Sequence, residues 1–158
     1  MSRADGASVH YSPLYIHSFR LIAPRRLLQI QSFQKYYQAY ETIETVWERL
    51  RWLRYQKELM QEDVAEFLGI SLVRYKTLED GCVDYIAKPL VDKLSALYNI
   101  APCDFLDDYN LFLYRGQGNQ LLAYRQQHGL SRAAFAKQIH ASPSSLSCWE
   151  ADKKRMHK

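Results

Sequence analysis

The feature that most constrains this chain is an internal repeat. At a shift of 71 residues, the segment 50–81 aligns without a gap with the segment 121–152, and seven of the 32 aligned positions are identical. Average residue usage would give about two identities by chance. We therefore expect two copies of one supersecondary unit. The identical pairs are Leu50/Leu121, Arg54/Arg125, Gln56/Gln127, Leu59/Leu130, Ala65/Ala136, Ser71/Ser142 and Glu79/Glu150.

The local sequence of each copy indicates short helices joined by tight turns. Gly69 suits a helix C-terminus, and Ser71 is a favourable N-cap for the helix that follows. Ala65 and Ala136 are small where two helices of a helix-turn-helix must cross closely. No alternating pattern of useful length indicates a strand, so the sequence predicts an all-α fold.

Two charged residues recur in both copies at the same separation. Arg54 and Glu79 are 25 residues apart, and so are Arg125 and Glu150. An arginine on an apolar helix face needs a carboxylate partner, because a buried unpaired charge is costly. Ordinary surface charges would not explain why both copies keep both residues. We therefore predict two structural ion pairs, Arg54 with Glu79 and Arg125 with Glu150.

Four motifs of the first copy carry a resemblance to a known family. They are L-x-x-x-R from Leu50, L-x-Q-x-x-x-A from Leu59, G-I-S from Gly69 and L-E-D-G from Leu78. This segment resembles the Cro/C1-type (lambda-repressor-like, XRE) helix-turn-helix family. The run K-P-L-V-D-K-L-S-A-L-Y-N-I from Lys88, with the Phe-Leu pair that follows, is similar to that family's fourth and fifth helices.

The resemblance implies a domain organisation. A complete lambda-repressor-like five-helix domain is expected over residues 46–108 and a truncated second helix-turn-helix module over 118–158. Between them, the run Gly116-Gln117-Gly118 indicates a linker, so a linker region is expected over 109–117. Before them we predict a poorly ordered leader over residues 1–24 and a long amphipathic helix over 25–45.

The leading helix is open to two interpretations. Apolar residues recur in steps of 3 and 4 from Ile30 to Leu50, so one unbroken helix could run to about Lys57. The alternative is two helices with a kink between residues 39 and 45. Because the second copy ends before counterparts of helices four and five, we expect residues 25–46 or a partner subunit to cover Leu146 and Trp149.

The resemblance also implies a site on double-stranded DNA, with the third helix of each module in the major groove. It gives phosphate contacts to Gln61 and, in the second copy, to Arg132. The remaining DNA-binding positions are Ser71, Leu72, Val73, Arg74, Lys76 and Thr77 in the first copy and Ser142, Ser144, Ser145 and Ser147 in the second.

These side chains differ in what they can recognise. Arg74 is the best single candidate for a guanine or phosphate contact, whereas Leu72 and Val73 could touch only a thymine methyl group. An equally weighted interpretation is that Leu72 and Val73 form a protein-facing apolar patch. The serines of the second copy can donate hydrogen bonds but discriminate weakly between bases.

The net charge of +4 is unevenly distributed. Residues 46–108 carry 8 basic and 12 acidic side chains, and residues 109–158 carry 8 basic and 2 acidic ones. Because phosphate neutralisation dominates DNA affinity, the first module is a poor stand-alone DNA binder. The incomplete second module has the better electrostatics.

Composition excludes other classes of function. The three cysteines are scattered, the five histidines form no metal spacing, and no phosphate loop or activated nucleophile occurs, so we expect no enzyme, no metal and no cofactor. No apolar run is long enough to span a membrane, which favours a cytoplasmic protein.

The first hypothesis is a sequence-specific transcriptional regulator of bacterial or phage type, often a homodimer in this family. The alternative is a protein-interaction adaptor that keeps the fold but has lost base recognition.

Overall fold

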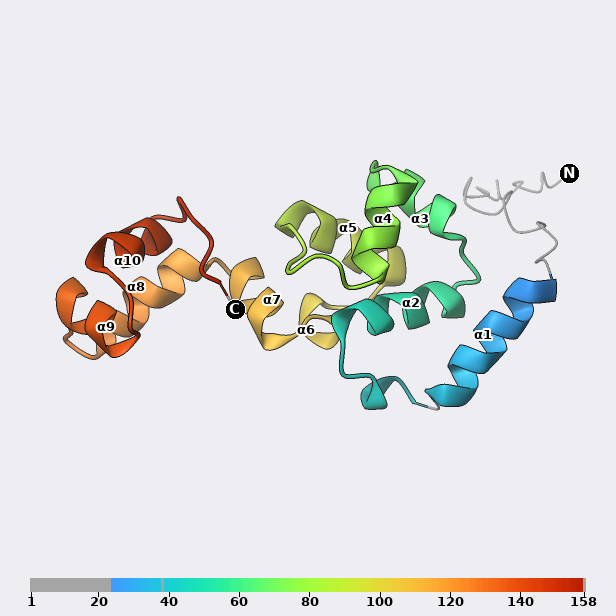
Figure 1. The fold of residues 1–158 in the computed structure, drawn as a ribbon, viewed down its shortest axis with the longest axis horizontal. Coiled ribbons are helices and arrows are strands. Elements are labelled where there is room, and N and C mark those ends of the chain that lie inside the picture. Colours follow the sequence, from blue (N-terminus) through green and yellow to red (C-terminus); the bar gives the residue numbers. More distant parts are fainter. Residues whose placement is uncertain (1–23, 38, 158) are drawn as a thin grey trace, which may run out of the picture. The chain divides into compact units, whose positions relative to one another are not determined.

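The computed structural model describes residues 24–37 and 39–157. Within that part of the chain all regular structure is helical and no strand occurs, so the predicted all-α class is confirmed (Figure 1). The chain divides into two compact units, residues 1–36 and residues 37–158. None of the described helices is long and apolar enough to cross a membrane.

The first unit contains one described helix, α1 (Pro24–Tyr36). The prediction of a helix over residues 25–45 is wrong, because the chain leaves the helical conformation after Tyr36 and Ala39 is extended, with φ −136° and ψ 144°. Of the alternative, two helices with a kink between residues 39 and 45, the two separate helices are confirmed, but the first one already ends at Tyr36 and the next α-helix begins at Val46. The predicted leader over residues 1–24 lies, except for its last residue, outside the described part of the chain.

The second unit begins with a segment that contains no α-helix in its described residues before Val46. A single 3-10 turn, η2 (Tyr40–Thr42), is followed by Thr45, whose side chain accepts a hydrogen bond from the backbone N–H of Glu48. This N-cap starts a new helix, because the hydroxyl satisfies a donor that has no partner inside the helix. Thr45 therefore fixes where α2 begins.

The first module consists of five helices within residues 46–108, the number expected there. They are α2 (Val46–Gln56), α3 (Gln61–Leu68), α4 (Leu72–Glu79), α5 (Lys88–Tyr98) and α6 (Pro102–Phe105) (Figure 1). Gly69 ends α3 at φ +70°, and Ser71 caps α4 by accepting from Arg74 N. Both features follow from the predicted turn chemistry. The centre of this module is formed by fully buried side chains, which include Leu50, Val64, Tyr75, Val91, Leu94 and Phe105.

The expected linker over residues 109–117 is wrong. Most of it belongs to α7 (Asp108–Tyr114), which Asp107 caps by accepting from Asn110 N. Asn110 is buried, and its Oδ1 atom accepts a hydrogen bond of 2.9 Å from Ile86 N in the first module. Glycine content suggested a flexible segment, but only Arg115 and Gly116 separate α7 from the next helix.

The second module repeats α2, α3 and α4 at the same shift of 71 residues. Its helices are α8 (Gln117–Gln127), α9 (Arg132–Gln138) and α10 (Pro143–Glu150). The left-handed backbone positions repeat as well: Glu58 with Gly129, Gly69 with His140, and Gly81 with Asp152 all have positive φ. The backbone is therefore repeated even where the residue type has changed.

The core of the second module is small, and the segments that pack against it are not the ones expected from the sequence. Its buried residues are Leu121, Phe135, Ala136 and Leu146, and Phe112, Leu130, Ile139, Trp149 and Met156 pack against them. The expectation that residues 25–46 cover Leu146 and Trp149 is wrong for the part of that segment in this unit, because Tyr40 and Val46 pack in the first core. Phe112 of α7 and Met156 of the C-terminal segment pack against the second core instead.

Candidate nucleic-acid interface

A buried arginine–glutamate pair ties α2 to α4 in the first module. Arg54 Nε and Nη2 donate to the two carboxylate oxygens of Glu79 at 2.6 and 2.9 Å, and Arg54 Nη1 donates to Leu59 O at 3.1 Å. Gln61 and Tyr75 donate two further hydrogen bonds to the same carboxylate. Because all three guanidinium nitrogens and both carboxylate oxygens have hydrogen-bond partners, the burial of the two charges is tolerated. The predicted Arg54–Glu79 pair is confirmed.

The second module contains the counterpart of this pair. Arg125 Nε and Nη2 donate to Glu150 at 2.6 and 3.4 Å, and Arg125 Nη1 donates to Leu130 O at 3.2 Å. Arg132 takes the place of Gln61 and donates to Glu150 at 3.1 Å. The predicted Arg125–Glu150 pair is confirmed. It is more exposed than the first one, because the side chain of Arg125 is 16% accessible and that of Arg54 only 4%.

Both glutamates are held in the charged form. Burial by itself would raise the pKa of Glu79, but the hydrogen bonds and charge of Arg54, with Gln61 and Tyr75, keep the pKa below its ordinary value. The hydrogen bond from Arg125 lowers the pKa of Glu150, burial opposes it, and Arg132 lowers it further. Each carboxylate therefore fixes the end of α4 or α10 against the first helix of its module.

The turn between the second and third helices is also the same in both modules. Ala65 and Ala136 are buried, and their carbonyl oxygens accept from Ile70 N at 3.0 Å and from Ala141 N at 2.8 Å. The third helix then begins at a serine cap in each case. In each module two helices are thus joined by a tight turn, which is the connectivity of a helix-turn-helix, and the second helix is held at its far end by an ion pair.

The outer face of α4 carries the residues predicted to contact DNA. Val73 is 70% exposed, Arg74 and Lys76 are exposed, and Leu72 and Thr77 are partly buried. Thr77 donates its hydroxyl to Arg74 O, while Ser71 is engaged as the N-cap. The helix therefore presents two cations and an apolar side chain outward.

The outer face of α10 is a cluster of hydroxyl groups. Ser142 caps the helix, and its Oγ lies 2.8 Å from Ser144 Oγ and donates to Ser145 Oγ at 2.9 Å. Ser147 is partly buried, whereas Ser144 is exposed. In this arrangement the hydroxyl groups near the cap bond to one another and would have to exchange partners to contact a nucleic acid.

The two predicted phosphate contacts differ in availability. The side-chain amide nitrogen of Gln61 donates to Glu79 at 2.8 Å, so one of its two hydrogens is directed into the module. Arg132 uses Nε for Glu150, and its side chain is 49% exposed. The terminal guanidinium nitrogens of Arg132 thus remain the better phosphate donors.

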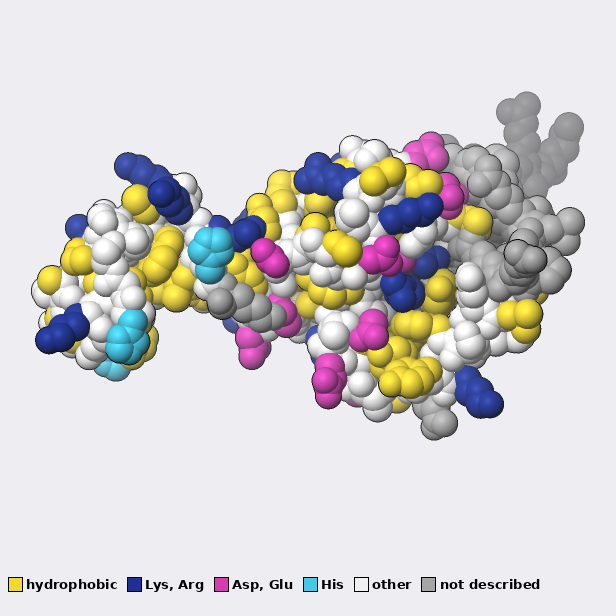
Figure 2. Space-filling model, viewed as in Figure 1, with side chains coloured by type: hydrophobic (Ala, Val, Ile, Leu, Met, Phe, Trp, Pro, Cys, Tyr) yellow, Lys and Arg dark blue, Asp and Glu magenta, His cyan; other side chains and the backbone are white. Residues whose placement is uncertain are grey.

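Charge separates the modules on the visible surface as it does in the sequence. In Figure 2 Lys and Arg side chains are visible on both parts, whereas Asp and Glu side chains are visible over the part that contains α2 to α7 and not over the part that contains α8, α9 and α10. Glu150 and Asp152, the two acidic residues after residue 108, are both engaged within the second module. Its outward charge is therefore positive.

Several buried polar contacts were not predicted from the sequence. Gln117, expected in the linker, is buried; its amide donates to Lys154 O at 2.5 Å and its Oε1 accepts from Met156 N at 2.9 Å. Tyr109 donates to Met156 O, and the Arg155 guanidinium lies 3.9 Å from the centre of the Tyr85 ring. These contacts join the C-terminal segment to both modules. No sequence pattern marks them.

Comparison of the chain with protein-family models, with curated proteins and with solved structures finds no match. Within the described residues, no group of three or more His, Cys, Asp or Glu side chains is placed to hold a metal ion. The three cysteines are free thiols. The argument for a function therefore depends on the geometry of the two helix-turn-helix modules.

Proposed function

We propose that this protein is a sequence-specific transcriptional regulator that binds double-stranded DNA, of the repressor-like bacterial or phage type. The observation that carries the proposal is the repeated helix-turn-helix, in which α4 and α10 are each held by an arginine–glutamate ion pair, buried in the first module and partly buried in the second, and present an outer face. Third helices of this kind enter the major groove in known regulators. Such a regulator would act in the cytoplasm, with no cofactor, and a homodimer would double the number of modules on DNA.

The two modules would contribute differently to binding. Arg74 and Lys76 on α4 offer the side chains that can discriminate bases, although the first module as a whole is acidic. Arg132 and the basic residues 153–155 offer phosphate neutralisation in a module with few acidic groups. The first module would therefore select the sequence, and the second would supply most of the electrostatic affinity.

Selection from a pool of random duplexes, followed by binding assays on the enriched sequence, tests the proposal. Arg74→Ala is expected to weaken binding by about 1–3 kcal/mol and to relax the preference at one base pair. Lys88→Ala is the matched control, because it removes the same charge from an exposed position on α5. No enrichment of any sequence, or equal losses for the two variants, would contradict the proposal.

A protein-interaction adaptor is the second candidate, and one observation favours it. Val73 is 70% exposed on the face of α4, next to the partly buried Leu72, within an acidic module. An adaptor would bind a protein through this apolar surface, and Val73→Asp would abolish that binding while Arg74→Ala would not. Weak DNA binding that ignores both substitutions would support the adaptor.

A further inference from the structure

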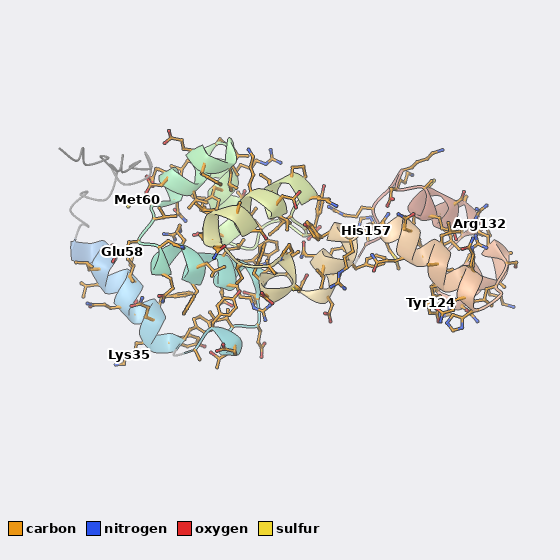
Figure 3. All side chains as sticks on the ribbon, turned by 180° about the vertical axis from the view of Figure 1, so that it is seen from behind. Lys35, Glu58, Met60, Tyr124, Arg132 and His157 are labelled. Atoms are coloured by element: carbon orange, nitrogen blue, oxygen red, sulfur yellow. The ribbon has the colours of Figure 1, made fainter. Side chains whose placement is uncertain are left out.

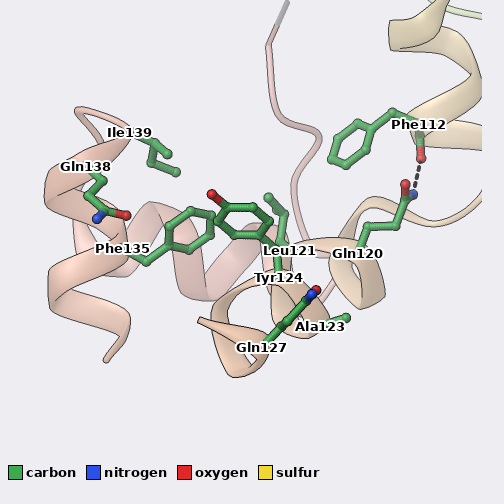
Figure 4. A pocket seen from close by; sticks show the side chains of 9 residues that line it. All are labelled: Phe112, Gln120, Leu121, Ala123, Tyr124, Gln127, Phe135, Gln138 and Ile139. Carbon is green, nitrogen blue, oxygen red and sulfur yellow. Dashed lines mark hydrogen bonds between the residues drawn. The ribbon is translucent and has the colours of Figure 1, made fainter. Parts of the chain in front are cut away.

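The second module has an open apolar groove on α8 and α9. Its volume is about 750 Å³, and it is lined in part by Leu121, Tyr124, Phe135 and Ile139, with Phe112 at one end (Figure 4). The Tyr124 and Phe135 rings lie side by side, with centroids 5.3 Å apart. None of the lining residues is charged or a histidine.

The repeat identifies what this groove corresponds to in the first module. At a shift of 71 residues, Tyr124, Phe135 and Ile139 align with Leu53, Val64 and Leu68. These three residues are buried in the first core, where α5 contacts α3 and α6 contacts α2. The exposed fraction is 9% for Leu53 and 49% for Tyr124. The groove is therefore the surface that α5 and α6 cover in the first module.

The first module also gives the pattern of a helix that covers this surface. α5 buries Val91, Leu94 and Tyr98, which are spaced i, i+3 and i+7 along one helix face. Lys93 Nζ donates to Leu68 O at 2.8 Å, at the end of α3. A ligand helix with the same three apolar positions matches the width of such a groove.

The net charge of the second module indicates which charge a helix bound in the groove should carry. Residues 109–158 carry 8 basic and 2 acidic side chains. Of the two acidic residues, Glu150 is paired with Arg125, and the exposed Asp152 accepts a hydrogen bond from Gly118 N. The module that carries the groove therefore has a net positive charge. An opposite charge on the partner steers its association, whereas a basic partner is repelled.

We propose that the groove on α8 and α9 binds an amphipathic helix of a partner protein, with apolar residues at i, i+3 and i+7 and acidic residues on its flanks. α1 of this chain or of a second copy does not meet this description, because residues 24–36 contain Arg25, Arg26 and Lys35 and no acidic residue. The bound helix would complete the second module as α5 and α6 complete the first.

This binding site is separate from the proposed DNA contacts. Tyr124, in the groove, and Arg132, the phosphate candidate, lie on different sides of the second module (Figure 3). A partner helix could therefore occupy the groove while α10 and Arg132 remain available. The partner would stabilise the basic module and recruit a second protein to the same chain.

A synthetic peptide of residues 86–106 is the probe, labelled with fluorescein and titrated with the full-length protein. A second peptide carries Lys88→Glu and Ala96→Glu, at two exposed positions of α5, and a third carries Leu94→Asp in the apolar face. The acidic peptide is expected to bind about two- to tenfold more tightly than the unmodified one at low salt, because each added charge gains a modest surface attraction. The Leu94→Asp peptide is expected not to bind.

Two matched protein variants locate the binding site. Ala123→Glu places a charge in the groove, and Gln126→Glu places the same charge elsewhere on exposed α8. Ala123→Glu should weaken binding of the acidic peptide about tenfold or more, and Gln126→Glu should weaken it much less. Circular dichroism melts of both variants check that α8 remains folded.

Three results would overturn the proposal. They are the absence of saturable binding by either competent peptide, equal effects of Ala123→Glu and Gln126→Glu, and a homodimer in sedimentation equilibrium that Ala123→Glu alone dissociates. The last result would assign the groove to a second copy of this chain. None of these outcomes depends on DNA binding, which is measured separately with the selected duplex.

Discussion

The two modules have the same backbone but differ in how their cores are closed. In the first, Tyr75 donates to Glu79 and lies 3.3 Å, oxygen to oxygen, from Tyr98 of α5, so the ion pair is sealed by a further helix. In the second, Leu146 replaces Tyr75, and Arg132 reaches Glu150 from a partly exposed position. The shared three-helix backbone is thus kept by a few repeated positions. How deeply its ion pair is buried depends on the helices that pack onto it.

A second difference between the modules is which of two aligned positions is occupied by glycine. In the first module Trp47 lies against Gly81, where an added Cβ would be 2.8 Å from the indole Cδ1 atom. In the second module the aligned residues are Gly118 and Asp152, and Gly118 N donates to Asp152 Oδ1 at 3.0 Å. The glycine thus lies on the third-helix side in the first module and on the first-helix side in the second, and an aromatic contact is replaced by a hydrogen bond.

The largest expected effect is loss of the sealed ion pair. Glu79→Ala should lower the free energy of unfolding by about 3–5 kcal/mol, because it leaves Arg54 buried without its partner. Glu150→Ala should cost about 1–3 kcal/mol, because Arg125 can reach solvent. Urea unfolding of both variants measures the difference. Equal losses would show that the closing helices do not matter to the pair.

The next effect concerns Gly118 in the first turn of α8. Gly118→Ala should cost about 1–3 kcal/mol, because the added Cβ would be 2.5 Å from Glu150 O and would force α8 and α10 apart. At an ordinary helix position the same change is favourable by about 0.5–1 kcal/mol. Asn119→Ala, at the exposed neighbouring position, is the control. A stabilised Gly118→Ala protein would contradict the close approach.

Acid should weaken both modules. The folded pKa values of Glu79 and Glu150 lie below the ordinary glutamate value, so the stability that these carboxylates contribute is complete above that value and is lost as the pH falls through the lowered ones. Urea midpoints measured from neutral pH to about pH 3 should fall. Glu79→Gln should show a smaller fall than the unmodified protein, and an identical pH dependence would rule out Glu79 as a source.

The smallest effect is expected at the C-terminal segment, which joins the modules. Arg155→Ala removes the guanidinium from the face of Tyr85 and should cost about 0.5–1 kcal/mol. Hydrogen exchange at Met156 N, which donates to Gln117, should become faster. Lys153→Ala removes the same charge from an exposed position and should leave this exchange unchanged. Equal exchange in both variants would indicate that Tyr85 does not hold the segment.

The sequence predicted what depends on local chemistry or on the repeat. Serine caps, the left-handed glycine after α3 and both ion pairs follow from residues at fixed spacing, and the structure contains them. The long helix over residues 25–45 was wrong because apolar periodicity continues past Tyr36, where α1 ends, and does not detect the new start at the Thr45 cap.

Other features of the fold depend on contacts that spacing does not encode. Gly116 and Gly118 suggested a linker, but Gly118 is required by the close approach of α10. The C-terminal segment covers the second core because Met156 meets a surface formed by α7 to α10. Which residues contact DNA remains a prediction, since exposure on α4 and α10 is a condition for contact and does not identify the ligand.

The salt dependence of DNA binding tests the central claim most directly, because it counts phosphate contacts in each module. With the selected duplex, the logarithm of the affinity should fall linearly with the logarithm of salt between about 50 and 200 mM. Arg132→Ala should reduce the magnitude of the slope by about 1, while Lys88→Ala should leave it unchanged. A slope near zero, or one that Arg132→Ala does not change, would contradict a helix-turn-helix protein whose second module supplies the electrostatic affinity.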